Sequence, residues 1–228
     1  MQQKLIQYLS TFITQERLDL FIKNLNYRTR YLTVVLEDIF QPQNASAVLR
    51  TCDCFGIQDI HIIENKNKFN INTKVELGSS KWLTMKRYNT LEHNSLKAIN
   101  ELKTNGYRIV ATSSHLTGTK LENFDLSKGK AAFVFGSELP GISEIISNEA
   151  DEFLTIPMYG FTESFNLSVS AAIILHHLTL TLRESNLINW KLTTGEKDKI
   201  KLEWLRRSIK KCEMIESEFY KSHTDSHD

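Results

Sequence analysis

Three short stretches of this chain combine amide, carboxylate and hydroxyl side chains in patterns that could hold a reacting molecule. The first, NASAVLR, places Asn44 six residues before Arg50. The second, FGSELPG, carries Glu138 between two glycines, directly after an apolar run. The third, SFN, places Ser164 and Asn166 before a long apolar segment. Such groups can bind hydroxyl-bearing or cationic ligands, and an arginine can bind phosphate.

Each stretch also has a purely structural interpretation. Asn44 could simply cap a helix, and Arg50 could pair with Asp53 one turn further on. Glu138 could be a solvated residue in a tight turn, and the third stretch could only cap the helix that follows. The second stretch is not a Walker A loop, because no Gly-Lys-Ser/Thr follows. It is not a GxGxxG loop either, because an acid replaces the middle glycine and would repel phosphate.

Segments typical of strands and helices alternate along the chain, and several of the strands are continuously apolar. This alternation predicts an α/β fold with a mainly parallel sheet covered on both faces. The second and third stretches follow strands, so we expect them at the edge where parallel sheets bind ligands. The predicted strands are 31–36, 59–63, 83–88, 107–112, 131–136 and 152–156, and the predicted helices are 44–55, 92–105 and 166–183.

The flanking segments are predicted to be helical and to lie outside the sheet. Residues 1–30 carry apolar residues at helical spacing, and Thr14 is a plausible N-cap. One helix near the C-terminus is predicted from an apolar stripe made of Leu202, Leu205, Ile209, Cys212 and Phe219. We therefore expect an N-terminal extension over 1–30, a central domain over 31–184 and a C-terminal extension over 185–228.

The charge of the chain is balanced, since 28 Lys and Arg residues face 27 Asp and Glu residues. The net charge of +1 does not favour a polyanion, so any nucleic-acid site must be a local patch. Two basic groups meet that description, one before the first strand and one near the C-terminus. They are Arg17, Lys23, Arg28 and Arg30, and Arg206, Arg207, Lys210 and Lys211.

The three cysteines have no zinc spacing, and their odd number favours a reduced protein. No apolar run approaches the length of a membrane span, and the N-terminus lacks the apolar core of a secretion signal. We therefore expect a cytoplasmic protein that needs no metal. The histidines show no partner pattern and are interpreted as structural: His61, His93, His115, His176 and His177.

Taken together and in this order, the three stretches resemble the SpoU/TrmH branch of the SPOUT RNA methyltransferases. The matching motifs are Asn44 with Arg50, then Gly-x-Glu-x-x-Gly at 136–141, then Ile-Pro-Met and Ser-x-Asn-x-Ser-Val-x-Ala-Ala within 156–172. The stretch GSSKW at 78–82 is also similar to the family. The resemblance covers roughly residues 28–183. A class I methyltransferase or a dehydrogenase would instead need a glycine loop after the first strand, and VVLEDIFQPQN has none.

The resemblance implies a fold, a cofactor and a reaction. Members are homodimers of the α/β-knot fold, with a deep trefoil knot near the C-terminal end of the sheet domain. They bind S-adenosylmethionine (AdoMet) in a bent form inside the knot and methylate ribose 2′-hydroxyls. Short helical extensions at both ends are similar to members that act on guanosine-18 in the D-loop of tRNA. Another tRNA position, rRNA, or a non-catalytic RNA-binding dimer are the alternatives.

The resemblance also assigns roles to residues. The implied catalytic residues are Asn44, Arg50, Glu138, Ser164 and Asn166, and the implied AdoMet-binding residues are Thr112, Gly136, Ile156 and Phe165. Arg28 and Arg183 are expected to bind tRNA on the same resemblance, and the two basic groups add Arg17, Arg30, Arg206, Arg207, Lys210 and Lys211.

Two roles stay open for Arg50 under this resemblance. One is a general base for the ribose hydroxyl, although deprotonating an arginine at neutral pH costs about 7 kcal/mol. The other is a charged group that binds the phosphate of the target and stabilises the developing alkoxide.

Overall fold

Parallel strands dominate the computed structural model, which describes residues 1–113 and 118–224. Within these residues seven strands form one sheet, ordered β3-β2-β1-β6-β4-β7-β5, and each adjacent pair is parallel. The carboxyl ends of the strands therefore meet at one edge. The strands are β1 Leu32–Glu37, β2 Asp59–Ile63, β3 Thr84–Tyr88, β4 Arg108–Thr112, β5 Thr119–Lys120, β6 Ala131–Phe135 and β7 Glu152–Thr155.

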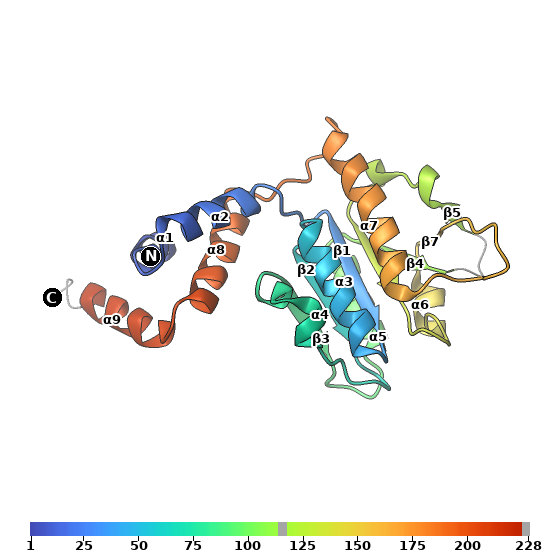
Figure 1. Cartoon of the computed structure of the whole chain (residues 1–228), viewed down its shortest axis with the longest axis horizontal. Helices are drawn as coiled ribbons and strands as arrows, with labels where there is room; N and C mark the ends of the chain where they lie inside the picture. The colour runs from blue at the N-terminus through green and yellow to red at the C-terminus, as the bar shows by residue number, and fades with distance from the viewer. Residues whose placement is uncertain (114–117, 225–228) are drawn as a thin grey trace. The chain divides into compact units, whose positions relative to one another are not determined.

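Helices cover both faces of this sheet, which confirms the predicted α/β architecture (Figure 1). On one face, α3 (Pro42–Cys54) and α7 (Leu167–Glu184) pack side by side. On the other face lie α5 (Ser95–Thr104) and α6 (Glu144–Glu149). Short helical turns complete this unit: α4 Thr73–Glu76, η1 Ser79–Lys81, η2 Leu121–Asn123 and η3 Leu126–Lys128.

The central strand β1 illustrates why most residues of a fully buried strand are apolar. Val34 and Leu36 pack in the core beneath α3 and α7, while Val35 packs in the core beneath α5. All six residues of the strand are buried, so no position is free to be polar without a partner. Burying each aliphatic side chain of this kind stabilises the fold by about 1.5–3 kcal/mol.

The start of α3 differs from the prediction that Asn44 caps this helix. The helix begins at Pro42 with Gln41 in the N-cap position, and Asn44 is buried within its first turn. Proline is favoured at the first helical position, because its missing N–H would be unpaired there and its φ already suits a helix. The other end agrees with the prediction, since Gly56 follows the helix with a φ of +73°.

The capping offered as a structural interpretation of the third stretch is observed at the start of α7. Asn166 precedes the helix, and its Oδ1 accepts a hydrogen bond from the backbone N–H of Ser168 at 2.9 Å. Capping uses only the oxygen of this amide, so its nitrogen stays available for a second contact.

A second compact unit consists of residues 1–28 and 191–228. It contains α1 (Gln2–Ser10), α2 (Gln15–Leu25), α8 (Thr194–Ser208) and α9 (Cys212–Thr224), with α8 packing against the other three. Thr14 caps α2 as predicted, because its hydroxyl accepts from the Arg17 N–H. The prediction of one C-terminal helix is wrong: α8 ends at Ser208, where Ile209 is extended, and Lys211, with a left-handed φ of +56°, precedes α9.

Strand β7 lies between β4 and β5 in the sheet. In the sequence, however, only residues 113–118 separate β4 from β5. Gly118 lies so close to β7 that a Cβ atom built on it would be 2.5 Å from the carbonyl oxygen of Phe153. A strand inserted between two such closely linked strands is compatible with a knot. The knot stays a prediction from the family resemblance.

Other sequence-based expectations concern membrane spans, metal sites and individual histidines. Within residues 1–113 and 118–224, no helix has the length and apolar character needed to cross a membrane. In the same part of the chain, no group of three or more His, Cys, Asp or Glu side chains is arranged to hold a metal ion. His115, interpreted as structural, lies outside the described residues.

His61 on β2 provides a test of the packing. Its half-buried ring stacks on Tyr88 and its Nδ1 lies 3.0 Å from the Tyr88 hydroxyl. Burial lowers the pKa of His61 to about 4, with nearby Glu101 opposing and Lys86 adding to the effect. The unfolded chain therefore takes up a proton before the folded one does. The stabilisation is complete above about pH 6.5 and is lost as the pH falls toward 4.

We expect the free energy of unfolding to fall by about 2 kcal/mol more between pH 7 and pH 5 in the wild type than in His61→Gln, which cannot titrate. Urea unfolding of both proteins at the two pH values measures this difference. A gap between the two proteins that does not change with pH would contradict a neutral, buried His61.

Candidate functional site

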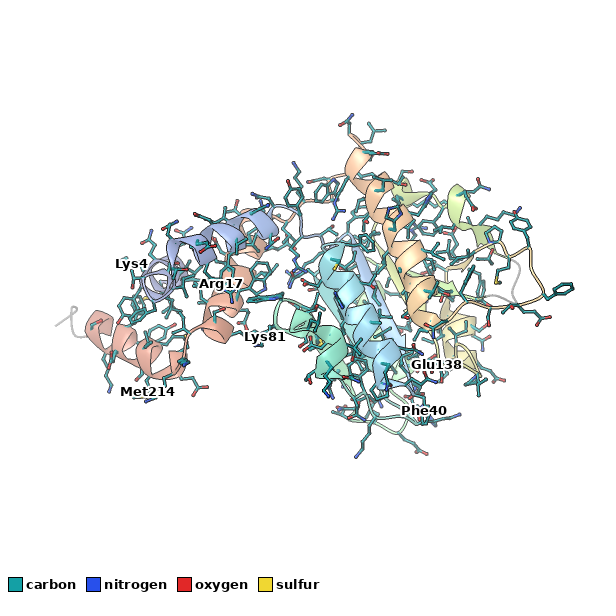
Figure 2. The ribbon with its side chains drawn as sticks, viewed as in Figure 1. Lys4, Arg17, Phe40, Lys81, Glu138 and Met214 are labelled. Carbon is teal, nitrogen blue, oxygen red and sulfur yellow. The ribbon has the colours of Figure 1, made fainter. Side chains whose placement is uncertain are left out.

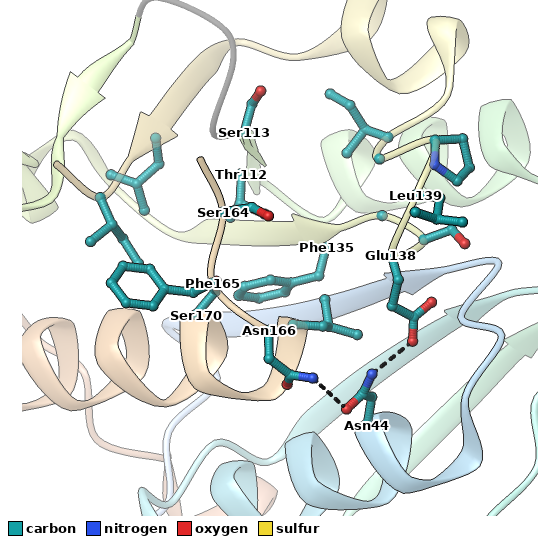
Figure 3. A pocket seen from close by; sticks show the side chains of 18 of the residues that line it. Asn44, Thr112, Ser113, Phe135, Glu138, Leu139, Ser164, Phe165, Asn166 and Ser170 are labelled. Carbon is teal, nitrogen blue, oxygen red and sulfur yellow. Dashed lines mark hydrogen bonds between the residues drawn. The ribbon is translucent and has the colours of Figure 1, made fainter. Parts of the chain in front are cut away.

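A cavity of about 620 Å³ opens at the carboxyl edge of the sheet (Figure 3). Its walls are the ends of β4, β6 and β7, the loops that follow them, and the first turns of α3, α6 and α7. Apolar side chains line part of it and polar groups the remainder. The apolar side chains include Phe135, Leu154, Ile156, Phe165 and Ile174, and the polar residues include Gln41, Asn44, Thr112, Glu138, Ser143, Ser164 and Asn166.

Three residues predicted from separate motifs are hydrogen-bonded to one another at this cavity. The Nδ2 of Asn44 donates to Oε1 of Glu138 at 2.9 Å, and its Oδ1 accepts from Nδ2 of Asn166 at 3.1 Å (Figure 3). The carboxylate can only accept a hydrogen bond here, so it fixes which end of the Asn44 amide faces it. Asn166 uses its oxygen to cap α7 and its nitrogen to reach Asn44. The three sequence motifs therefore meet in one network.

The loop that carries Glu138 is built by close backbone packing. Gly141 donates its N–H to the Ser137 carbonyl at 2.9 Å and has a φ of +72°. A Cβ atom on Gly136 would lie 2.2 Å from the backbone of Gly141, so only glycine fits there. At the other side of the loop, Oε2 of Glu138 accepts from the N–H of Phe40 at 3.4 Å, beside the start of α3 (Figure 2).

The residues predicted to bind a cofactor all line the cavity. Thr112 ends β4, Gly136 follows β6, Ile156 follows β7, and Phe165 precedes α7. The Thr112 hydroxyl donates to the Val134 carbonyl at 2.9 Å, which fixes its rotamer. Ser164 lines the same cavity. Their common placement agrees with the grouping that the sequence suggested, while their individual roles stay predictions.

Arg50 is the exception among the predicted catalytic residues. It lies on α3 but is exposed, and it does not line the cavity. Six residues on a helix correspond to about 600° of rotation, which leaves the Asn44 and Arg50 side chains about 120° apart. Asn44 faces the cavity, so Arg50 projects from a different face of α3.

Several of the predicted tRNA-binding cations are held by other parts of the chain. Arg28 is 5% exposed and its guanidinium lies over the Trp204 ring at 5.3 Å. Arg30 forms an ion pair with Asp59 at 3.0 Å, and Arg183 donates to the Phe55 carbonyl at 2.6 Å. These three residues therefore have structural contacts that the sequence did not reveal.

Arg206 is similarly engaged. Its guanidinium donates to both carboxylate oxygens of Glu216, at 2.8 and 3.1 Å, and to Glu203 at 3.0 Å. The hydrogen bond to Glu216 raises the pKa of Arg206 above its usual value, and the same pair lowers the pKa of Glu216. The remaining cations predicted to bind tRNA are exposed: Arg17, Arg207, Lys210 and Lys211.

Gln41 and Ser143 are among the polar cavity residues that sequence reasoning missed. Gln41 accepts from Nδ2 of Asn44 at 3.2 Å, and Ser143 caps α6. The signal for Gln41 was the following Pro42, because proline at the first helical position identifies the residue before it as the N-cap. Ser143 precedes Glu144 and an apolar pair, which is a weak sign of a helix start.

Comparison with protein families matches residues 31–176 to the SpoU rRNA Methylase family. Over 214 residues the chain is 45% identical to the tRNA (guanosine(18)-2′-O)-methyltransferase of Borreliella burgdorferi, which covers 94% of this chain and 95% of that protein.

Two solved structures are also similar to this chain. The TrmH/SpoU tRNA modifying enzyme of Aquifex aeolicus has a TM-score of 0.76 and is 30% identical, covering 86% of this chain and 98% of that one. The SpoU methyltransferase AviRb of Streptomyces viridochromogenes, solved with its cofactor AdoMet, has a TM-score of 0.58. At 19% identity over 72% of this chain and 63% of that one, this last likeness concerns the fold alone.

Replacing Gly136 should disturb the loop directly. We expect Gly136→Ala to destabilise the protein by about 1–3 kcal/mol, because the new methyl group overlaps backbone atoms that cannot move aside cheaply. Gly195→Ala is the matched control, since nothing lies within 4 Å of its Cβ position and α8 tolerates alanine. Thermal unfolding measures both. Equal melting temperatures for the two variants would contradict the close packing of this loop.

Proposed function

This chain belongs to the SpoU rRNA Methylase family, and on that premise we propose that it is an AdoMet-dependent tRNA 2′-O-ribose methyltransferase acting on guanosine-18. The observation that carries the proposal is the network of Asn44, Glu138 and Asn166, which joins the three motifs at one cavity. The name of the Borreliella burgdorferi relative supports guanosine-18 as the target. The proposed place of action is the cytoplasm.

The cavity is suited to AdoMet. Its volume lies within the usual range of about 300–1,000 Å³ for small-molecule sites, and apolar and polar groups both line it. Phe135, Leu154 and Ile156 offer an apolar surface to an adenine ring, and the backbone of the 136–141 loop offers hydrogen bonds. When bound, AdoMet supplies a methyl group already activated on a sulfonium. The proposed binding residues are Thr112, Gly136, Ile156 and Phe165.

The chain then has to bind and orient the ribose hydroxyl. Asn44 is fixed by Glu138 on one side and by Asn166 on the other, so its amide presents hydrogen-bonding groups in one orientation. Ser164 lines the same cavity and can hold the ribose. Such positioning converts an encounter into an aligned reaction, which can account for several kcal/mol of barrier reduction. Transfer would form the bond between the 2′ oxygen and the methyl carbon while that carbon's bond to the sulfonium sulfur breaks, and the hydroxyl proton would pass to a base or to water.

Arg50 is proposed to act in a homodimer, on the site of the partner. This assignment is supported by its position, because Arg50 is exposed on α3 and does not line the cavity of its own chain. In a two-fold symmetric dimer each contact occurs twice, so an Arg50 that reaches the partner's cavity is matched by the partner's equivalent arginine reaching this one. In the partner's site, Arg50 either removes the hydroxyl proton or stays charged, binds the target's phosphate and stabilises the developing alkoxide.

The proposed tRNA contacts fall on both helical extensions. Arg17, Arg207, Lys210 and Lys211 are exposed and can release counterions on binding phosphate. Arg28 and Arg183 belong to the same proposal through the family resemblance, and Arg30 and Arg206 through the two basic groups. Their present contacts would have to be shared with the tRNA or exchanged for it.

The proposed reaction predicts a specific product. We expect the purified protein, with AdoMet carrying a tritiated methyl group and with EDTA present, to label bulk tRNA at guanosine-18. Mapping the modified nucleotide identifies the position. Labelling elsewhere in tRNA or in rRNA would correct the substrate. AdoMet binding by calorimetry without any labelling would favour a non-catalytic RNA-binding dimer.

The proposed sharing of Arg50 predicts complementation between inactive variants. Arg50→Ala and Asn166→Ala are unfolded together and refolded as a mixture. If Arg50 serves the partner's site, each heterodimer has one intact site, and random pairing makes about half of all dimers heterodimers. Activity should then approach about a quarter of the wild-type value. A mixture no more active than its parents, with heterodimers demonstrated, would assign Arg50 to its own chain's site.

A further inference from the structure

A buried carboxylate lies beside the cavity without lining it. Glu37 ends β1 and is 2% exposed. Its Oε1 accepts hydrogen bonds from the hydroxyls of Ser95 at 2.5 Å and Ser143 at 2.7 Å, and its Oε2 accepts from the Ser143 N–H at 2.9 Å. Burying a carboxylate costs several kcal/mol unless such hydrogen bonds compensate it. An apolar residue would fill this position at a lower cost, so the carboxylate calls for an explanation.

The three hydrogen bonds reach two different helices. Ser95 is the first residue of α5 and is completely buried, and its hydroxyl also accepts from Nδ2 of Asn65 at 2.9 Å. Ser143 caps α6, because its hydroxyl accepts from the Ile146 N–H at 3.2 Å. Of these two serines, Ser143 lines the cavity and Ser95 does not. One side of the Glu37 network therefore belongs to the cavity wall and the other side to the loops behind it.

Ser143 is also the last residue of the loop that carries Glu138. Strand β6 fixes the start of this loop, and the hydrogen bond between Gly141 and Ser137 closes its middle. Glu37 fixes its end through both the backbone and the side chain of Ser143. Held at both ends, the loop presents Glu138 to Asn44 at 2.9 Å.

We propose that Glu37 is a positioning residue: by holding Ser143 it fixes the 136–143 loop, so that Glu138 meets Asn44 and the loop backbone faces the cofactor. Glu37 itself touches neither substrate nor cofactor. The inference rests on the proposed function in so far as the cavity binds AdoMet and the ribose. A displacement of about 1 Å at a reacting group can cost about 100-fold in rate, so loss of this anchor should reduce turnover.

The two serines give a matched pair of variants, because each donates its hydroxyl to the same oxygen of Glu37. Ser143→Ala removes the side of the network at the cavity, and Ser95→Ala removes the side at α5. We expect Ser143→Ala and Glu37→Gln to lower kcat for tRNA methylation by about 10- to 100-fold and to weaken AdoMet binding in calorimetry. We expect Ser95→Ala to lower the melting temperature while kcat and Kd stay within about twofold of the wild type. Equal losses of activity in the two serine variants would reduce Glu37 to a structural residue and overturn the proposal.

A double-mutant comparison tests whether Glu37 acts through Glu138. Glu37→Gln should cost little further turnover when Glu138 is already replaced by Gln, because the group that it positions is gone. Losses that simply multiply would overturn the proposal. Wild-type methylation is measured first, and its absence would contradict the proposed function instead.

Hydrogen exchange of the Gly141 amide tests, without any ligand, whether Glu37 holds the 136–143 loop in place. We expect faster exchange in Glu37→Gln and Ser143→Ala but not in Ser95→Ala. Unchanged exchange in the first two variants would overturn the proposal.

Discussion

The side-chain amide of Asn44 is the point through which the parts of the site are joined. It is 7% exposed, so each of its polar atoms needs a partner, and an unpaired one would cost about 1–3 kcal/mol. Glu138 satisfies its nitrogen and Asn166 its oxygen. The loop after β6 and the start of α7 must therefore both reach the first turn of α3. This requirement explains why the polar motifs are separated by long apolar segments, which build the surfaces that bring them together.

The parallel sheet makes that meeting geometrically possible. Because β1 and β6 are adjacent and parallel, the segments that follow them leave from the same edge. The same face of the sheet carries α3 and α7 side by side, so Asn44 and Asn166 approach from neighbouring helices. The cavity forms where β4 and β7 end beside them. Core packing thus determines which loops become neighbours, and the polar residues then fix the fine geometry.

Buried polar residues extend this organisation behind the cavity. Glu37 and Ser143 connect the end of β1 with the loop after β6, and Ser95 carries the network on to α5. Fully satisfied polar networks of this kind rigidify a structure, whereas a single missing partner leaves a buried group unpaired. Two arginines of the helical unit are held by distant partners in the same way. Arg28 packs on Trp204 and Arg206 pairs with Glu216, so neither can be read as an unpaired charge from its position in the sequence.

The sequence by itself determined the local features whose causes lie within a few residues. The apolar runs of β1 and β6, the caps at Thr14 and Asn166 and the helix end at Gly56 could all be predicted, because each depends on neighbouring side chains and backbone geometry. The motifs also predicted which residues gather at the cavity, through their resemblance to a known family. The α/β class followed from the alternation of strands and helices.

Tertiary structure decided the features that depend on distant partners. Asn44 was predicted to be a cap but is buried within the helix, because its amide is held by residues about a hundred positions away. The end of α8 at Ser208 and the burial of Glu37 likewise left no local pattern to read. A sequence records which side chains can form hydrogen bonds or be buried. Only the packed chain selects the partner, because the cost of leaving a polar group unpaired arises once water has been excluded.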